Sequence, residues 1–335
     1  MTMNSRALAS AVLGTVIVAY LAQLFYAPAQ AQRQAAQRVS AQAAALNQRG
    51  LEYARSGKFD DAIQAFNDAL TLQPNFTYAH FNLGIVYNVL QRYPEAIQSF
   101  TLVIQLDPGY AAAYGNLGNA LISIGNNQAA ITPLLKAIEL DPSSAQVYND
   151  LGAAYFNQEL YGKAVDAFQR AVALEPSDAE IQFNLGNALT TLQRHREGLA
   201  CYLKATELRP DWAIAHEHLG DAALRAQRFE LAAQAYTHVT YLRPDFAEGF
   251  GRLGFVYGKM KRYREAISAL KRAVELKPDY SSAYFNLGLI YIQLNNKRSA
   301  AEQLQLLRTI DSGMARELLD DMHPDKIIKA HPLVP

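Results

Sequence analysis

Two helical patterns of apolar residues alternate along most of the chain, and residues 145–178 show both. The first pattern follows the three- and four-residue spacing of one helix face, at Tyr148, Leu151, Gly152 and Tyr155. The second follows the same kind of spacing, at Ala164, Phe168 and Ala171. Pro176 then ends the second helix, because proline lacks an N–H and clashes with the preceding turn. The segment therefore predicts two short helices joined by a turn.

This unit recurs every 34 residues without insertion or deletion. The glycines of the series are Gly50, Gly84, Gly118, Gly152, Gly186, Gly220, Gly254 and Gly288. Prolines keep the same interval, at Pro74, Pro108, Pro142, Pro176, Pro210, Pro244 and Pro278. A helix pair this small cannot bury its own apolar face, so each unit is expected to pack on the next. The periodicity predicts an array of helix pairs rather than two globular domains.

The unit resembles the tetratricopeptide repeat family. The resemblance rests on Tyr148-x2-Leu151-Gly152-x2-Tyr155, followed by Ala164, Phe168, Ala171 and Pro176. It implies an all-α fold, a right-handed α-solenoid of eight 34-residue helix-turn-helix repeats. Counted from Ala43, the repeats begin at residues 43, 77, 111, 145, 179, 213, 247 and 281 and end at residue 314.

Both ends of the array depart from the pattern. Repeat 1 has Arg49 where the others have leucine, and repeat 8 has Ser312 where the others have proline. Residues 315–335 are expected to form a capping helix over Ala315–Met322 and a tail, and residues 32–42 a helical lead-in.

The first 31 residues do not follow the repeat pattern. Ala7–Tyr26 is a 20-residue run without a charge, preceded by Arg6. It is long enough to span a bilayer, and the small residues Ala27, Ala29 and Ala31 also fit cleavage of a signal peptide. A buried core helix is the third reading. The first two predict a protein exported or anchored in a membrane. The leader resembles bacterial ones, which implies the periplasm, or the thylakoid lumen or membrane if the source is cyanobacterial.

Composition narrows the class of partner. Lys and Arg number 31 and Asp and Glu number 31, so the chain is neutral and lacks the basic surface that nucleic-acid binding needs. One cysteine excludes an intrachain disulfide. We therefore expect a protein or peptide partner, contact with a membrane only through an uncleaved N-terminal segment, and the option of a homo-oligomer.

Three apparent chemical motifs are explained by their places within the repeat helices. Residues 249–254 spell GxGxxG inside a first helix, with no strand before them as a dinucleotide site requires. His216 and His218 point to different helix faces, although a metal site from Glu217, His218 and Asp221 stays open as an alternative. Cys201 has no evident base and acid beside it. We expect no enzyme activity, cofactor or metal.

Position 6 of the repeats predicts a row of polar side chains in the groove, because the family resemblance places this position on the concave face. The row comprises Asn82, Asn116, Asp150, Asn184 and Asn286, and His218 and Arg252 interrupt it. Arg252 is itself expected to be one of the groove residues. It resembles the asparagine ladder of O-linked N-acetylglucosamine transferases and predicts side chains that face solvent and hold a peptide by its backbone. The alternative is that Asn-Leu-Gly is merely common in such repeats. The two-carboxylate clamp of chaperone-tail binders is not carried over, since Asn47 and Leu51 stand at its first positions.

Aromatic side chains accompany this row and would anchor apolar side chains of a ligand. They are Tyr78, Phe81, Phe156 and Phe183. The sequence thus predicts a non-enzymatic scaffold that binds an extended peptide in its concave groove and assists assembly of an envelope or membrane complex. The alternative is a self-associating structural protein whose groove is filled by its own terminal segment.

Overall fold

The computed structural model describes residues 41–322, and every helix or strand assigned within them is an α-helix. The predicted signal or anchor segment 1–31, the lead-in up to residue 40 and the tail after Met322 lie outside the described residues. The chain divides into two compact units, residues 1–175 and 176–335, each described here by itself. Between residues 41 and 322, no helix combines the length and the hydrophobicity needed to cross a membrane.

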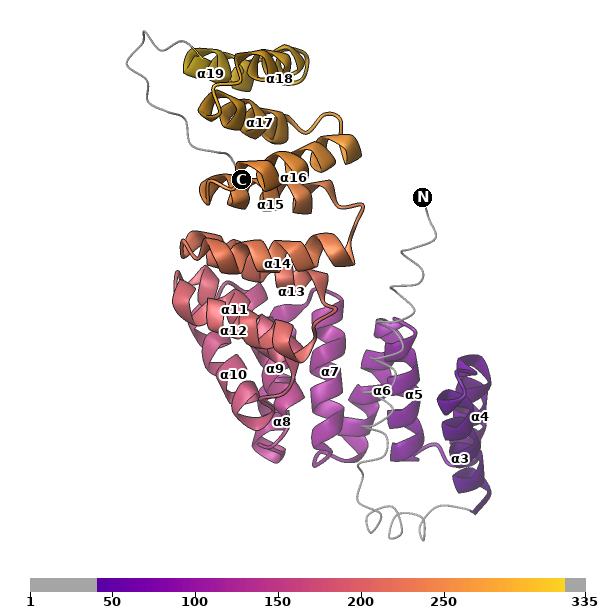
Figure 1. Cartoon of the computed structure of the whole chain (residues 1–335). Helices are drawn as coiled ribbons and strands as arrows, with labels where there is room; N and C mark the ends of the chain where they lie inside the picture. Colours follow the sequence, from indigo (N-terminus) through magenta and orange to yellow (C-terminus); the bar gives the residue numbers. More distant parts are fainter. Residues whose placement is uncertain (1–40, 323–335) are drawn as a thin grey trace. The chain divides into compact units, whose positions relative to one another are not determined.

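Unit 1 consists of four antiparallel helix pairs (Figure 1). The helices are α3 (Ala41–Arg55), α4 (Phe59–Leu72), α5 (Thr77–Val89), α6 (Tyr93–Leu106), α7 (Ala111–Ser123), α8 (Asn127–Leu140), α9 (Ala145–Asn157) and α10 (Tyr161–Leu174). Unit 2 has four more pairs and one additional helix. Its helices are α11 (Ala179–Thr191), α12 (His195–Leu208), α13 (Ala213–Arg225), α14 (Phe229–Leu242), α15 (Ala247–Lys259), α16 (Tyr263–Leu276), α17 (Ser281–Gln293), α18 (Lys297–Ile310) and α19 (Ser312–Met322). The prediction of an all-α array of paired helices is confirmed.

The recurrent glycine marks the crossing of the two helices in a pair. A Cβ on Gly152 would lie 2.6 Å from the Phe168 ring, and one on Gly84 would lie 2.7 Å from the Phe100 ring. Both rings are fully or almost fully buried. The glycine therefore provides the space into which the large side chain of the second helix inserts.

The turn between the two helices of each pair has the same backbone conformation in all eight repeats. The residue at position 15 of the repeat has a positive φ angle. Gly57 and Gly125 occupy this position in repeats 1 and 3. The other repeats have Gln91, Glu159, Gln193, Gln227, Lys261 and Asn295. The next N–H donates to the carbonyl five residues back, as from Arg92 to Tyr87 at 2.8 Å, which is the Schellman closure of a helix. In six repeats, a residue other than glycine therefore adopts the left-handed backbone conformation at this position.

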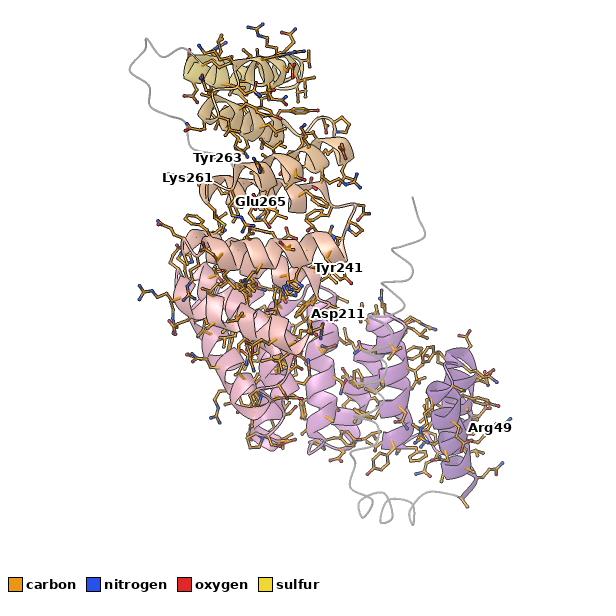
Figure 2. All side chains as sticks on the ribbon, in the orientation of Figure 1. Arg49, Asp211, Tyr241, Lys261, Tyr263 and Glu265 are labelled. Carbon is orange, nitrogen blue, oxygen red and sulfur yellow. The ribbon has the colours of Figure 1, made fainter. Side chains whose placement is uncertain are left out.

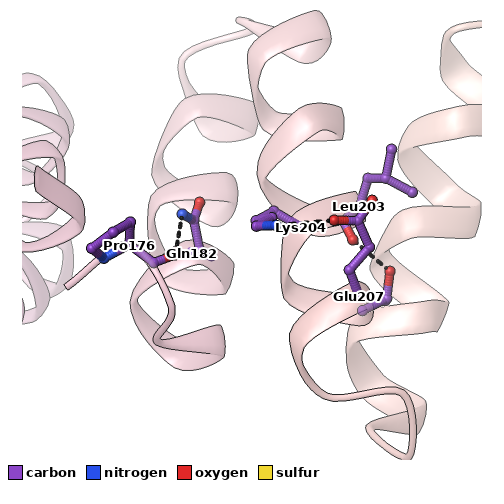
Figure 3. Close-up of polar contacts among 6 residues, drawn as sticks. Pro176, Gln182, Leu203, Lys204 and Glu207 are labelled. Atoms are coloured by element: carbon purple, nitrogen blue, oxygen red, sulfur yellow. Dashed lines mark hydrogen bonds and ion pairs between the residues drawn. The ribbon is translucent and has the colours of Figure 1, made fainter.

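A side chain at position 4 ties each of three repeats to the turn before it. Gln182 Nε2 donates to the Pro176 carbonyl at 3.3 Å (Figure 3). The Nε2 atoms of His216 and His80 contact the carbonyls of Pro210 and Pro74 at 2.9 and 2.8 Å. These contacts give the proline carbonyls, which lie in the turn beyond each second helix, a hydrogen-bond partner.

The capping helix is present, but it begins earlier than predicted. Helix α19 starts at Ser312 rather than Ala315, because Asp311 Oδ1 accepts hydrogen bonds from the N–H groups of Gly313 and Met314 at 2.9 and 3.0 Å. Leu318 of α19 is fully buried and lies against Gly288, where a Cβ would approach it to 2.5 Å. In the preceding repeats a side chain of the second helix makes this contact.

Candidate functional site

The first helices of successive pairs touch one another and form one face of each unit. In unit 1, α3 contacts α5, α5 contacts α7, and α7 contacts α9. In unit 2, α15 contacts α17. We call this surface the first-helix face, and the predicted peptide-binding residues all lie on its helices.

A row of hydrogen bonds crosses the first-helix face of unit 1. Asn88 Nδ2 of α5 donates to Asn119 Oδ1 of α7 at 3.3 Å. Asn119 Nδ2 in turn donates to Asp150 Oδ2 of α9, also at 3.3 Å. Gln146 Nε2 donates to the second oxygen of Asp150 at 2.8 Å. Asn119 thereby joins three helices, bonding α5 through an amide and α9 through a buried carboxylate.

The partners in this row are 31 residues apart rather than 34. A step of three residues is close to one helical turn, so each first helix meets the next with an offset of about one turn. Unit 2 repeats the spacing, since Arg252 of α15 donates to Asp221 of α13. Position 6 alone does not reveal these bonds, because its partners Asn119 and Asp221 stand at position 9 of their repeats and Asn88, the partner of Asn119, at position 12. The signal that could have found them is polar residues spaced by 31.

The expectation that the position-6 residues face solvent is wrong for most of them. Exposed fractions are 7% for Asn82, 8% for Asn116, 7% for Asp150 and 2% for Asn286. Asn82 Nδ2 donates to Asn47 Oδ1 at 2.9 Å, and Asn116 Nδ2 donates to the Ala112 carbonyl of its own helix at 2.8 Å. Asn184 is half-buried. These donors hold helices together or satisfy their own backbone, so they form no continuous ladder open to a ligand.

The predicted aromatic anchors also differ in exposure, since one is buried in the core and the others are half-buried. Phe81 is buried, with its ring centroid 5.7 Å from that of Phe100 and 4.9 Å from that of Tyr110. Tyr78 and Phe156 are half-buried and rest on Tyr110 and Tyr161, at 6.1 and 5.2 Å between centroids. Phe81 therefore belongs to the core, whereas the other two rings keep surface that a ligand could cover.

In unit 2, Phe183 is half-buried within an aromatic cluster. Its ring centroid lies 4.7 Å from Trp212, 4.9 Å from His218 and 5.7 Å from Tyr202. Phe183 on α11 thus joins the second helix α12, the turn after it and the first helix α13. Part of this cluster is accessible at Phe183, Trp212 and His218.

The Arg252 and Asp221 ion pair is half-buried. The hydroxyl of the fully buried Tyr236 also donates to Asp221. Burial, followed by the charge of Asp221, raises the pKa of Tyr236. Burial opposes the charge on Arg252, but Tyr236 and Asp221 outweigh it and hold the pKa of the guanidinium above its ordinary value. Arg252 is therefore permanently charged and bound to its own fold.

The histidine pair, Cys201 and the GxGxxG segment all take part in packing within the repeats. The ring of His216 stacks on His238 at 4.7 Å, while His218 turns toward Phe183. Within residues 41–322, no three His, Cys, Asp or Glu side chains are grouped so that they could bind a metal ion. Burial, with a contribution from Glu197, raises the pKa of the Cys201 thiol to about 11, so it is protonated at neutral pH. The GxGxxG residues lie within α15 and make room for neighbouring side chains, as Gly251 does for Tyr280.

Comparison with family models gives matches across most of the repeat array. Models described as tetratricopeptide repeat match residues 47–111 and 183–245, 145–178, and 281–311. One described as TPR repeat matches residues 118–159 and 259–295. None of the curated proteins compared with the chain matches it.

Solved structures show the same fold. YrrB, described as a TPR protein with an unusual peptide-binding site, is 27% identical with a TM-score of 0.52; the alignment covers 56% of this chain and 97% of YrrB. The C-terminal part of a TPR repeat-containing protein from Cytophaga hutchinsonii is 18% identical with a TM-score of 0.59. That alignment covers 72% of this chain and 98% of the other. At this identity the second likeness concerns the fold alone.

Proposed function

The chain belongs to the tetratricopeptide repeat family, a family of protein-binding scaffolds, and we propose that it is a non-enzymatic adaptor that binds an extended segment of a partner protein on its first-helix face. The observation that carries the proposal is a set of apolar side chains left half-exposed on three successive helices of unit 1. They are Tyr78 on α5, Ile122 on α7 and Phe156 on α9. YrrB, whose description names a peptide-binding site, adds support.

The buried polar row explains how this surface is held open. The Asn88, Asn119 and Asp150 bonds fix α5, α7 and α9 against one another. Because the helices cannot close over the half-exposed side chains, the apolar surface stays available to a partner. A rigid face of this kind binds a peptide at a low cost in ordering of the protein itself.

The test is selection of peptides from a random library by the full-length chain. We expect selected peptides to lose affinity for Ile122→Ser and Phe156→Ser. The control is Leu135→Ser, because Leu135 is 47% exposed on the second helix α8. Binding that survives both first-helix substitutions and falls with Leu135→Ser would place the site elsewhere. Failure to select any peptide would contradict the proposal.

We propose further that the protein is exported or tethered to a membrane, and that it assists assembly of an envelope or membrane complex there. The support is the uncharged run of residues 7–26 with its alanine-flanked end. The mass of the protein isolated from its source tests this. Cleavage after Ala29 or Ala31 means export, and the full mass in the membrane fraction means an anchor. The full mass in the soluble fraction contradicts both.

A further inference from the structure

Three carboxylates on the first helices α13 and α15 of unit 2 are already neutralised by cations of the same unit. Asp221 accepts from Arg252, and Glu248 accepts from Lys277 Nζ at 2.8 Å. Glu217 Oε2 lies 3.9 Å from Arg243 Nη1. The hydrogen bond from Lys277 is the main cause that lowers the pKa of the Glu248 carboxyl. The acidic residues of this surface are therefore all paired with basic residues of the same unit.

Two cations remain on the same surface. Arg225 and Lys259 occupy equivalent positions, since each is the last residue of its helix, α13 and α15. Both side chains are exposed, and neither forms an ion pair with any residue between 41 and 322. Lys259 Nζ lies 5.2 Å from the centroid of the Phe255 ring. The C-terminal end of a helix favours a positive charge, so both sites hold their cations without an acidic partner.

The surroundings of Arg225 supply apolar and polar groups for a ligand. Arg225 follows His218 by seven residues on α13, which is about two helical turns, so both side chains lie on the same face of that helix. His218 itself contacts Phe183 and Tyr202 of the aromatic cluster. Burial lowers the pKa of His218; Arg225 and Arg252 add to the effect, while Asp221 and Glu217 oppose it. The imidazole is therefore neutral at neutral pH, and the positive charge next to the half-buried rings of Phe183 and Trp212 comes from arginine and lysine.

We infer that the α13 and α15 face of unit 2 binds a partner segment that carries side-chain carboxylates, held by Arg225 and Lys259, with adjacent apolar side chains against Phe183 and Trp212. The inference rests on the proposed function and adds the chemical class of the ligand. Charge complementarity selects an acidic segment, because the carboxylates of this face are paired and its two unpaired charges are positive. The ligand groups are side chains within a segment, so a free C-terminus is not required.

Three peptides of identical length test this class of ligand on the full-length chain. Each is a 12-residue peptide, acetylated and amidated, built from the unit Glu-Leu-Glu-Gly, with the glutamates kept, replaced by glutamine or replaced by lysine. We expect the glutamate peptide to bind more tightly than the glutamine peptide, by about 1.4- to 5-fold for each cation engaged. The lysine peptide should bind weakest. The advantage of glutamate should shrink as salt is raised.

Protein variants then locate the site. Arg225→Gln and Lys259→Gln should each reduce affinity for the glutamate peptide, and the double variant should bind glutamate and glutamine peptides equally. The matched control is Lys271→Gln, which removes an exposed positive charge from the second helix α16. Because all three side chains are exposed, thermal melting should show that the variants fold normally.

Two results would overturn the inference. One is equal affinity of the native chain for glutamate and glutamine peptides, including no binding of either. The other is loss of glutamate binding in Lys271→Gln but not in the Arg225 and Lys259 variants. Neither result touches the proposed function, which the library selection and the unit 1 variants Ile122→Ser and Phe156→Ser decide independently.

Discussion

At the scale of single residues, the packing glycines and the turn residues follow different rules. Gly152 has no space for a Cβ because Phe168 fills it, whereas Gly162 near the start of α10 has no heavy atom within 4 Å of where its Cβ would be. The 34-residue series separates the two, since Gly162 does not belong to it. The periodicity thus identifies the glycine at the helix crossing of each repeat.

We predict that alanine changes the free energy of unfolding differently at these two glycines. Gly152→Ala should lower the free energy of unfolding by about 1–3 kcal/mol, because the buried Phe168 ring must move. Gly162→Ala should leave it unchanged or raise it by up to about 1 kcal/mol, through the helix propensity of alanine. Urea unfolding measures both. A loss of equal size at the two sites would mean that backbone freedom, not packing, explains the conserved spacing within the chain.

His216 makes the stability of the protein depend on pH. Burial is the main cause that lowers its pKa, and the stacked His238 adds to it, while the hydrogen bond to Pro210 opposes the shift. The unfolded chain therefore binds more protons than the folded chain between the two pKa values. The contribution of His216 to stability is retained above the ordinary histidine pKa of about 6.5 and is lost as the pH falls through the folded-state pKa.

His216→Gln should remove this dependence, because Gln182 makes the equivalent bond to Pro176 with an amide that does not titrate. We expect the variant to melt close to the native chain at about pH 7.5 and to lose less stability at about pH 5. Thermal melting across this range gives the result. A difference between the two proteins that stays constant with pH would contradict the assignment.

At the scale of helices, the first-helix face of unit 1 depends on polar bonds between neighbouring repeats. Asp150 accepts from Asn119 on α7 and from Gln146 on its own helix. Loss of Asp150 leaves both donors without this acceptor at a site that is 7% exposed. The row is therefore expected to contribute to the alignment of the helices as well as to stability.

A double-mutant cycle on Asn119→Ala and Asp150→Ala should give a coupling energy of about 0.5–1.5 kcal/mol. The control cycle uses Asn157→Ala and Asn127→Ala, because Asn157 Nδ2 donates to Asn127 Oδ1 at 3.0 Å in an exposed position. Its coupling should be close to zero. Equal couplings in the two cycles would show that burial adds nothing to the row.

The helices were predictable from the sequence, whereas the exposure of the candidate site was not. Helix pairs follow from apolar spacing, glycine and proline, which act within a few residues of one another. The orientation of Asn82 depends on Asn47 of the preceding repeat, and that of Phe81 on Phe100 and Tyr110. These partners come from the preceding repeat or from the second helix and the turn of the same repeat, and the local pattern around Asn82 or Phe81 does not encode them. Family position numbers therefore selected residues of the first helices but assigned buried residues to their surface.

At the scale of the whole molecule, stability should be transmitted only between neighbouring repeats. Helix α19 contacts α17 and α18, and its Leu318 fills the space at Gly288. The surface of the array carries isolated apolar side chains as well, such as Tyr241 on α14, which is 81% exposed (Figure 2). A single exposed side chain of this kind is ordinary for a soluble surface, whereas the end of the array needs a covering helix.

Leu318→Ala should lower local stability by about 2–4 kcal/mol by creating a cavity under α19. Hydrogen exchange should become faster in α17 and α18 and change little in α13 and α14, since the loss is confined to adjacent helices. Tyr241→Ala is the control and should leave exchange unchanged in all of them. Uniform acceleration throughout unit 2 after Leu318→Ala would show that the unit unfolds as one cooperative block instead.

The 31-residue pairing makes the order of the repeats part of the information in the sequence. Removing residues 247–280 would delete one complete repeat and preserve the 34-residue period. Asp221 would then face Asn286 in place of Arg252, so a neutral amide would replace its charged partner. Loss of this one repeat would therefore keep the helix pairs intact but break a charge match between neighbours, so the 34-residue period alone does not decide which repeats can adjoin.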